Sequence, residues 1–496
     1  MLYSNTKNLV HIFSDNRFIL ILLFLFSLII RLLFINAGLF HHDSVQLAIA
    51  TEETVKTFEL HAAVGGKLVL VLINSLIFLI PYYFLKVTSA EFTITLTSIF
   101  FAALSICFLY LFLRELTNKV FISFASSILF SVTPIYLSVT TYAKSHSLSI
   151  FFVLLAAYTL IKSTKENSKK LGFISGLSLG ILLFIRPSDF LFIIPFIFLF
   201  LYAHKIIKLE NSKARFKVNF LYLIVLPLLL ISLLYGITQF SVIVSQIKSN
   251  PLVFDKIVLL SSIVSLINTT TIIGFLFLFI GLYYLFIKNR YLLAFFLFWF
   301  FTTYIYYSNV FTFAQRFLIL SLIPIMILVG YGLEFFYIKN KIIAFIILIL
   351  IASSMFLSIY PIIKYRHVHS GGKDLALFVN NLTENNSVVI IGDDGPFLDY
   401  YGYRRTIAYP ATNNKELLDN FIEKVNDILD SNINVYIPET NYIYHHPPKE
   451  SKMVYDLINE NFNVTVVGEI IWENYHHASI LSQKFDVYLF KLDKNS

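Results

Sequence analysis

Long apolar segments recur along most of this 496-residue chain and limit the folds open to it. A transmembrane helix needs about 20 mostly apolar residues. Eleven runs approach or exceed that length, at roughly 18–36, 92–113, 120–139, 147–162, 171–185, 189–203, 218–235, 258–287, 291–307, 317–338 and 342–362. With 57% hydrophobic and only 14% charged residues, the composition excludes a soluble enzyme and a disordered chain. We predict a polytopic α-helical membrane protein with about eleven transmembrane helices.

Basic residues orient these predicted helices, because cytoplasmic loops of membrane proteins are enriched in Lys and Arg. A twelfth apolar run, 68–85, is interrupted by Pro81 and several aromatic residues. If this run does not cross, the N-terminus and the cytoplasmic loops hold 17 Lys and Arg residues, and the outside loops of the membrane domain hold 8. We therefore place 68–85 as a re-entrant or interfacial helix in a long first outside loop, 37–91. The N-terminus is then cytoplasmic, and the +8 charge reflects membrane topology rather than nucleic-acid binding.

The composition changes sharply after residue 363. We predict a transmembrane domain over 1–363 and a soluble extracytoplasmic α/β domain over 364–496. Apolar residues from Leu417 to Leu429 repeat at helical spacing. Short β-rich runs occur at 388–393, 406–409, 434–438, 463–469 and 486–492. The only cysteine of the chain, Cys107, lies in an apolar run, so an intramolecular disulfide is excluded.

Chemistry is expected where ionisable residues meet the outer membrane face. His41, His42 and Asp43 directly follow the first predicted span. A carboxylate at the outer face can take a proton from an attacking hydroxyl, so Asp43 is the candidate catalytic base and His42 its candidate partner. The alternative is structural: Asp43 stands where a helix starts and could serve only as its N-cap.

Cations from separate segments are predicted on the same face. Lys144, Arg186 and Arg316 each lie at the outer end of a predicted span, and Lys67 follows two glycines in the first loop. Arginine binds phosphate oxygens bidentately and stabilises a departing phosphate. These four residues are therefore candidate ligands for a lipid phosphate. For Arg186 and Arg316 the structural alternative is an interfacial anchor whose charged end reaches the headgroups.

Taken together, these motifs resemble the GT-C class of membrane glycosyltransferases, in particular its protein mannosyltransferase and aminoarabinose transferase branch. Asp43 matches the catalytic aspartate that opens the first outside loop in that class, although Ser44 replaces the acid that normally follows. His146 stands where the second outside loop commonly carries an acid, and Glu53 is the next carboxylate along the first loop. Arg186 follows a Gly-rich span and resembles the family's phosphate-binding residue. Arg316 resembles the arginine that precedes a late span in the family.

The resemblance implies an inverting glycosyltransferase. Its donor would be a sugar on a polyprenyl (dolichyl or undecaprenyl) phosphate, and its acceptor a hydroxyl on a protein, glycan or lipid. His146 and Glu53 would orient substrates. No cofactor is required, a divalent metal is optional, and no nucleic-acid partner is implied. A transporter or flippase of a lipid-linked saccharide, or a non-catalytic membrane scaffold, stays open. Transporters, however, favour ionisable groups at the bilayer midplane, whereas these lie at the outer ends of the predicted spans.

Overall fold

The chain forms two compact units, seen in a computed structural model. The membrane unit comprises Met1–Ile35 and Ala50–Lys364, and the C-terminal unit comprises Asn36–Ile49 and Tyr365–Ser496. Lys67 and the predicted span 218–235 lie outside the residues that the structure describes. The described residues are 16–61, 68–206, 256–308, 315–392, 395–410, 414–439, 456–475 and 482–494.

Helices dominate the membrane unit, because a segment crossing lipid must satisfy all its backbone polar groups internally. They are α2 (Asn16–Leu32), α4 (Leu68–Leu85), α5 (Glu91–Thr117), α6 (Val120–Val132), α7 (Pro134–Thr140), α8 (Ser145–Glu166), α9 (Lys169–Ile185), α10 (Ile193–Ile206), α14 (Lys256–Lys288), α15 (Arg290–Ser308) and α16 (Ile319–Lys339). Two more helices, α3 (His42–Thr57) and α17 (Lys341–Val368), contain the boundaries between the units.

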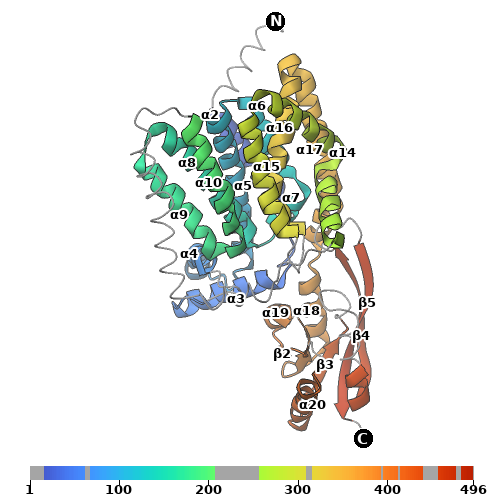
Figure 1. The fold of residues 1–496 in the computed structure, drawn as a ribbon. Coiled ribbons are helices and arrows are strands. Elements are labelled where there is room, and N and C mark those ends of the chain that lie inside the picture. Colours follow the sequence, from blue (N-terminus) through green and yellow to red (C-terminus); the bar gives the residue numbers. More distant parts are fainter. Residues whose placement is uncertain are drawn as a thin grey trace. The chain divides into compact units, whose positions relative to one another are not determined.

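The polytopic helical fold is confirmed. Among the described residues, seven helices are long and apolar enough to cross a membrane, or eight if the bent pair α6–α7 counts as one span. The number of eleven spans stays a prediction. Figure 1 shows α5, α8, α10, α15 and α16 running lengthwise through the membrane unit.

The core of the membrane unit centres on α16, which packs against α6, α14 and α15. Glycines let α14 and α16 approach closely: a Cβ at Gly332 would lie 2.2 Å from the carbonyl oxygen of Phe277. A Cβ at Gly281 would lie 1.8 Å from the carbonyl oxygen of Leu328. Small residues at such contacts are typical of helices packed within a membrane.

The run 68–85 forms the single helix α4. It contacts α5 and α9, and it is seen nearly end-on in Figure 1, whereas α5 and α8 run lengthwise. A helix lying across the bundle is what an interfacial or re-entrant segment requires. Because α4 is also long and apolar enough to span a membrane, its place in the first outside loop stays a prediction.

The predicted run 120–139 is broken in the structure. Helices α6 and α7 meet at Thr133 with a bend of 61°, because Pro134 has no N–H to continue the first helix. At this break the backbone carbonyl of Ser131 accepts a hydrogen bond from Nη2 of the buried Arg31 guanidinium at 3.1 Å. Arg31 Nε donates to Thr140 Oγ1 at 2.8 Å. One arginine thus ties α2 to both halves of the broken helix.

The C-terminal unit contains a five-stranded sheet in the order β2-β1-β3-β5-β4. Strand β1 pairs in parallel with β2 and β3, whereas β5 pairs antiparallel with β3 and β4. This confirms the predicted α/β composition. The strands are β1 (Val388–Ile390), β2 (Arg405–Ile407), β3 (Val435–Pro438), β4 (Phe462–Tyr475) and β5 (Ser482–Lys494).

Helix α20 (Lys415–Asp430) covers part of this sheet and was expected from its apolar spacing. Its buried side chains Phe421 and Val425 join the core formed by Val388, Ile437 and Leu492. The helix begins where the side chain of Asn414 accepts a hydrogen bond from the backbone of Glu416 at 3.0 Å. Asn is a favoured N-cap because its oxygen satisfies such an orphan N–H.

Candidate functional site

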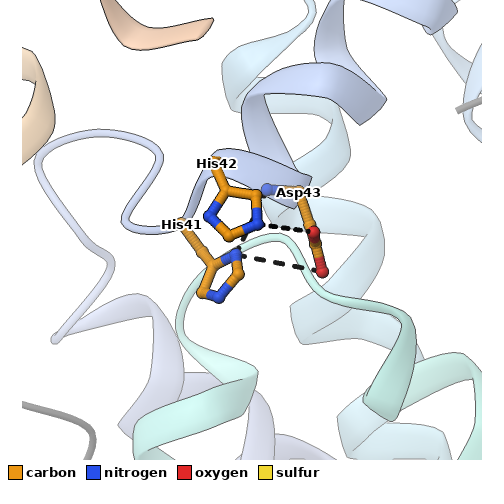
Figure 2. A group of neighbouring side chains, drawn as sticks. All are labelled: His41, His42 and Asp43. Carbon is orange, nitrogen blue, oxygen red and sulfur yellow. Dashed lines mark hydrogen bonds and ion pairs between the residues drawn. The ribbon is translucent and has the colours of Figure 1, made fainter. Parts of the chain in front are cut away.

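The carboxylate of Asp43 lies among the two histidines that precede it, at the start of α3 (Figure 2). Its Oδ1 is 3.1 Å from Nε2 of His42, and its Oδ2 is 3.9 Å from Nδ1 of His41. His41 is buried, whereas His42 and Asp43 are partly exposed. The two imidazoles pack against each other with centroids 4.1 Å apart. Asp43 and His42 thus form a compact pair that solvent can reach.

Asp43 does not cap α3 in the way its sequence position suggests. The helix begins at His42, and the backbone N–H groups of Ser44 and Val45 both donate to the carbonyl of His41, at 2.8 and 3.2 Å. Asp43 therefore lies inside the first turn, where a negative charge is favoured by the helix dipole. Its side chain is paired with His42.

Among the residues that the structure describes, these three form the group that could hold a metal ion, because one ligand atom from each lies within 4.8 Å of the others. Nδ1 of His41 accepts the backbone N–H of Asp43 at 3.1 Å, and a nitrogen cannot accept that bond and coordinate a cation through the same lone pair. In this conformation His41 could therefore coordinate a cation only through its other ring nitrogen, Nε2. No step of the reaction is assigned to a metal.

Arg186 lies in a buried polar cluster of the membrane unit. Pro187 ends α9 and starts a short 3₁₀ turn, Pro187–Phe192, so that Asp189 folds back onto the arginine. Arg186 Nε is 3.2 Å from Asp189 Oδ1 and donates to Ser188 Oγ at 3.1 Å. Asp189 also accepts hydrogen bonds from Ser149 on α8 and Tyr307 on α15.

The aromatic ring of Phe317 brings two of the predicted cations together. Phe317 and Arg316 belong to the 3₁₀ turn η3 (Gln315–Leu318) that precedes α16. The guanidinium carbons of Arg186 and Arg316 each lie 5.2 Å from the centre of this ring. That distance is within the range of a cation–π interaction. Arg186 also lies 5.9 Å from the ring of Tyr307.

Lys144 and His146 lie where α7 ends and α8 begins, and both are buried. The segment is fixed to α5, because Ser98 Oγ donates to the carbonyl of Tyr142 at 3.2 Å. Ser98 Oγ also lies 2.8 Å from Ser147 Oγ.

Glu53 lies on α3 and is exposed, with Oε2 3.5 Å from Nδ1 of His61. Lys67 lies outside the described residues. Sequence reasoning missed the roles of Asp189, Tyr307 and Ser149. Asp189 had a usable signal, since it stands three residues after Arg186 beside a helix-ending proline. Tyr307 had none, because 30 tyrosines are spread along the chain.

Residues 75–235 match a family model described as dolichyl-phosphate-mannose-protein mannosyltransferase. Among solved structures, ArnT from Cupriavidus metallidurans bound to undecaprenyl phosphate is similar, with a TM-score of 0.60 and 10% identity over 95% of this chain and 97% of that chain. The Archaeoglobus fulgidus oligosaccharyltransferase in complex with Zn and sulfate has a TM-score of 0.54 and 12% identity, over 85% of this chain and 68% of that one.

Arabinofuranosyltransferase AftD from mycobacteria is also similar, with a TM-score of 0.57 and 12% identity, over 97% of this chain and 40% of AftD. No curated protein sequence matches this chain. At these identities the structural likeness establishes the fold, and the family model supports it independently. The resemblance expected from the sequence motifs is confirmed: residues 75–235 match a mannosyltransferase family model, and the chain has a polytopic membrane-protein fold similar to that of the solved GT-C glycosyltransferases ArnT and AftD.

Proposed function

We propose that this protein transfers a sugar from a polyprenyl phosphate to a hydroxyl acceptor at the outer membrane face, with inversion at the anomeric carbon. The observation that carries the proposal is the convergence of Arg186 and Arg316 on Phe317. Two arginines from separate segments that contact the same aromatic ring are suited to a dianionic leaving group. The solved ArnT structure contains undecaprenyl phosphate, which supports a lipid phosphate as the anion.

Asp43 acts as the general base in this proposal. Its carboxylate removes the proton from the acceptor hydroxyl as that oxygen bonds to the anomeric carbon. The bond between the anomeric carbon and the phosphate oxygen breaks, and its electron pair leaves with the polyprenyl phosphate. One displacement from the face opposite the phosphate inverts the configuration. His42, 3.1 Å from the carboxylate, holds it in place for this proton transfer.

Arg186 acts as the principal phosphate ligand. Asp189 and Ser188 engage its Nε, and among the described residues no hydrogen bond is assigned to Nη1 or Nη2 of Arg186. These two nitrogens therefore present a pair of donors for bidentate binding of phosphate. Arg316, Lys144 and Lys67 would supply further positive charge as the lipid phosphate departs.

His146 and Glu53 would orient the substrates rather than react with them. His146 is buried at the start of α8, close in sequence to Lys144, so it suits a role beside the phosphate. Glu53 is exposed on α3 and suits contact with the acceptor. In this arrangement the C-terminal unit lies outside the membrane. The protein would need no cofactor, and a divalent metal would be an optional addition.

The test uses purified full-length protein with radiolabelled polyprenyl-phosphate sugars that differ in sugar and lipid. We expect transfer to a hydroxyl-bearing acceptor, release of polyprenyl phosphate and an inverted anomeric configuration, each read by chromatography and NMR. Binding of a donor without turnover by any acceptor would favour the flippase alternative. Neither binding nor transfer across the whole panel would contradict the proposal and favour a scaffold.

A further inference from the structure

The short segment that carries Asp43 belongs to the C-terminal unit. Residues Asn36–Ile49 cluster with Tyr365–Ser496, although the chain between them forms the membrane unit. The proposed chemistry assigns no role to residues 365–496 of this unit. Their contacts with residues 37–40, shortly before Asp43, indicate one.

Backbone groups of Ala37 and Leu39 form hydrogen bonds with residues between Arg366 and Tyr401. The N–H of Ala37 donates to the carbonyl of Arg366 at 2.9 Å. The N–H of Leu39 donates to the hydroxyl oxygen of Tyr401 at 2.9 Å, and the carbonyl of Leu39 accepts from Ser370 Oγ at 3.2 Å. Both polar groups of Leu39 are therefore satisfied by side chains more than 300 residues away in sequence.

Side-chain packing fixes the same segment. The Arg366 guanidinium carbon lies 3.9 Å from the centre of the Phe40 ring, close contact for a cation–π pair. Arg366 and Leu39 are fully buried. At Gly38 the backbone passes so near the C-terminal unit that a Cβ would lie 2.9 Å from Ser370 Oγ. Residues 37–40 are thus held along their whole length.

Two neighbouring side chains contact the ring of Tyr401. Tyr401 lies in the π-helical turn Leu398–Gly402, and its ring is roughly parallel to that of Phe397 with an interplanar angle of 15°. The Lys373 ammonium is 5.1 Å from the Tyr401 ring and also donates to the carbonyl of Ala37 at 3.2 Å. Single π-helical turns are rare and occur frequently at functional sites.

We infer that the C-terminal unit positions the proposed catalytic carboxylate, with Tyr401 and Arg366 as positioning residues. The inference rests on the proposed function of Asp43. The anchored residues 37–40 lead directly into His41, whose Nδ1 accepts the N–H of Asp43. The anchor therefore fixes the start of α3, and the carboxylate with it. Tyr401 and Arg366 need not touch substrate, since they act through Asp43.

The test compares Tyr401→Phe with wild type and with Tyr403→Phe, a matched control. Tyr403 lies two residues away with its side chain exposed, so losing its hydroxyl should change nothing. Tyr401→Phe removes the acceptor for the Leu39 N–H and keeps the ring. Hydrogen exchange of peptide 36–45 is measured in full-length protein in detergent, and the kcat and donor KM of transfer are measured on the same samples.

Tyr401→Phe loses a single neutral hydrogen bond. We therefore expect the amide hydrogen-exchange rate of peptide 36–45 to rise about three- to tenfold. We expect kcat to fall by a similar factor, with the donor KM unchanged, because phosphate binding lies in the membrane unit. Unchanged exchange would overturn the inference whatever the activity. Faster exchange with unchanged kcat would also overturn it, while leaving the proposed function intact. If wild type transfers no sugar, the proposed function fails, and with it the catalytic part of the inference.

Discussion

Arg186 and Arg316 share one aromatic ring: the guanidinium carbon of each lies 5.2 Å from the centre of Phe317. The two arginines stand 130 positions apart in the sequence, at the end of α9 and at the start of η3. Like charges repel, so such an arrangement is stabilised when an anion lies between or beside them. In the proposed function that anion is the phosphate of the lipid donor.

The first prediction concerns the binding of that phosphate by Arg186. Arg186→Ala should raise the donor KM and lower kcat by about 10²–10³-fold, the usual cost of losing one donor to a developing negative charge. Arg290→Ala is the matched control, since Arg290 stacks on Phe286 at 5.1 Å and is exposed. Steady-state kinetics over a range of donor concentrations measure both effects. Equal kinetics for the two variants would contradict a phosphate-binding role for Arg186.

The second prediction concerns Asp189, which pairs with Arg186 in a buried site. Removing one partner of a buried ion pair costs about 3–5 kcal/mol, because the other charge is left uncompensated. Asp189→Ala should therefore lower the melting temperature of the detergent-solubilised protein. Asp189→Asn keeps an acceptor for Tyr307 and should unfold closer to wild type, while its donor KM rises. If both variants melt like wild type, the pair does not stabilise the fold.

The third prediction concerns membrane orientation. In a Cys107→Ala background, cysteines at the exposed positions Phe58 and Leu417 should react with an impermeant maleimide applied from outside intact cells. A cysteine at the exposed position Lys169 should react only after the membrane is opened. Labelling of Lys169→Cys from outside, with protection of the other two cysteines, would contradict the predicted topology. It would also contradict the location of the site at the outer face.

The fourth prediction concerns pH. Burial raises the pKa of the Asp374 carboxyl above its ordinary 3.8, although His369 and the backbone of Ser370 oppose the shift. The folded state then binds this proton more tightly than the unfolded state, so stability is lost as pH rises from about 3.8 through the raised pKa. Asp374→Asn should remove this loss. The melting temperatures of wild type and Asp374→Asn should match at low pH. At higher pH the variant should have the higher melting temperature.

Much of the fold follows from the sequence, because hydropathy reports on lipid exposure directly. The run 92–113 became α5, and 317–338 became most of η3 and α16. The break at Thr133 escaped prediction, since hydropathy is insensitive to a proline inside an apolar run. In the C-terminal unit the predicted strands begin within one residue of β1, β2 and β3, whereas β4 and β5 extend further than predicted, as a two-stranded ladder.

The candidate site was predictable only in part. Charges at the ends of apolar runs are conspicuous, so Asp43, Arg186 and Arg316 could be found from the sequence. Their buried partner Tyr307 could not, because it meets Asp189 only when the 3₁₀ turn Pro187–Phe192 packs against α15. The attachment of residues 37–40 to Arg366 and Tyr401 was equally hidden. Sequence separation of more than 300 residues leaves no local pattern to detect.

The most direct test of the central claim is the transfer rate of Asp43→Asn, compared with Glu59→Gln. Glu59 is an exposed carboxylate of the same loop, so its neutralisation should leave the rate near wild type. Asparagine keeps the size and helix compatibility of Asp43 but cannot accept a proton from the hydroxyl. We predict that Asp43→Asn folds normally and that kcat falls by about 10²–10⁴-fold. Retention of more than about a tenth of wild-type kcat, far above that expected loss, would contradict the assignment of Asp43 as the base.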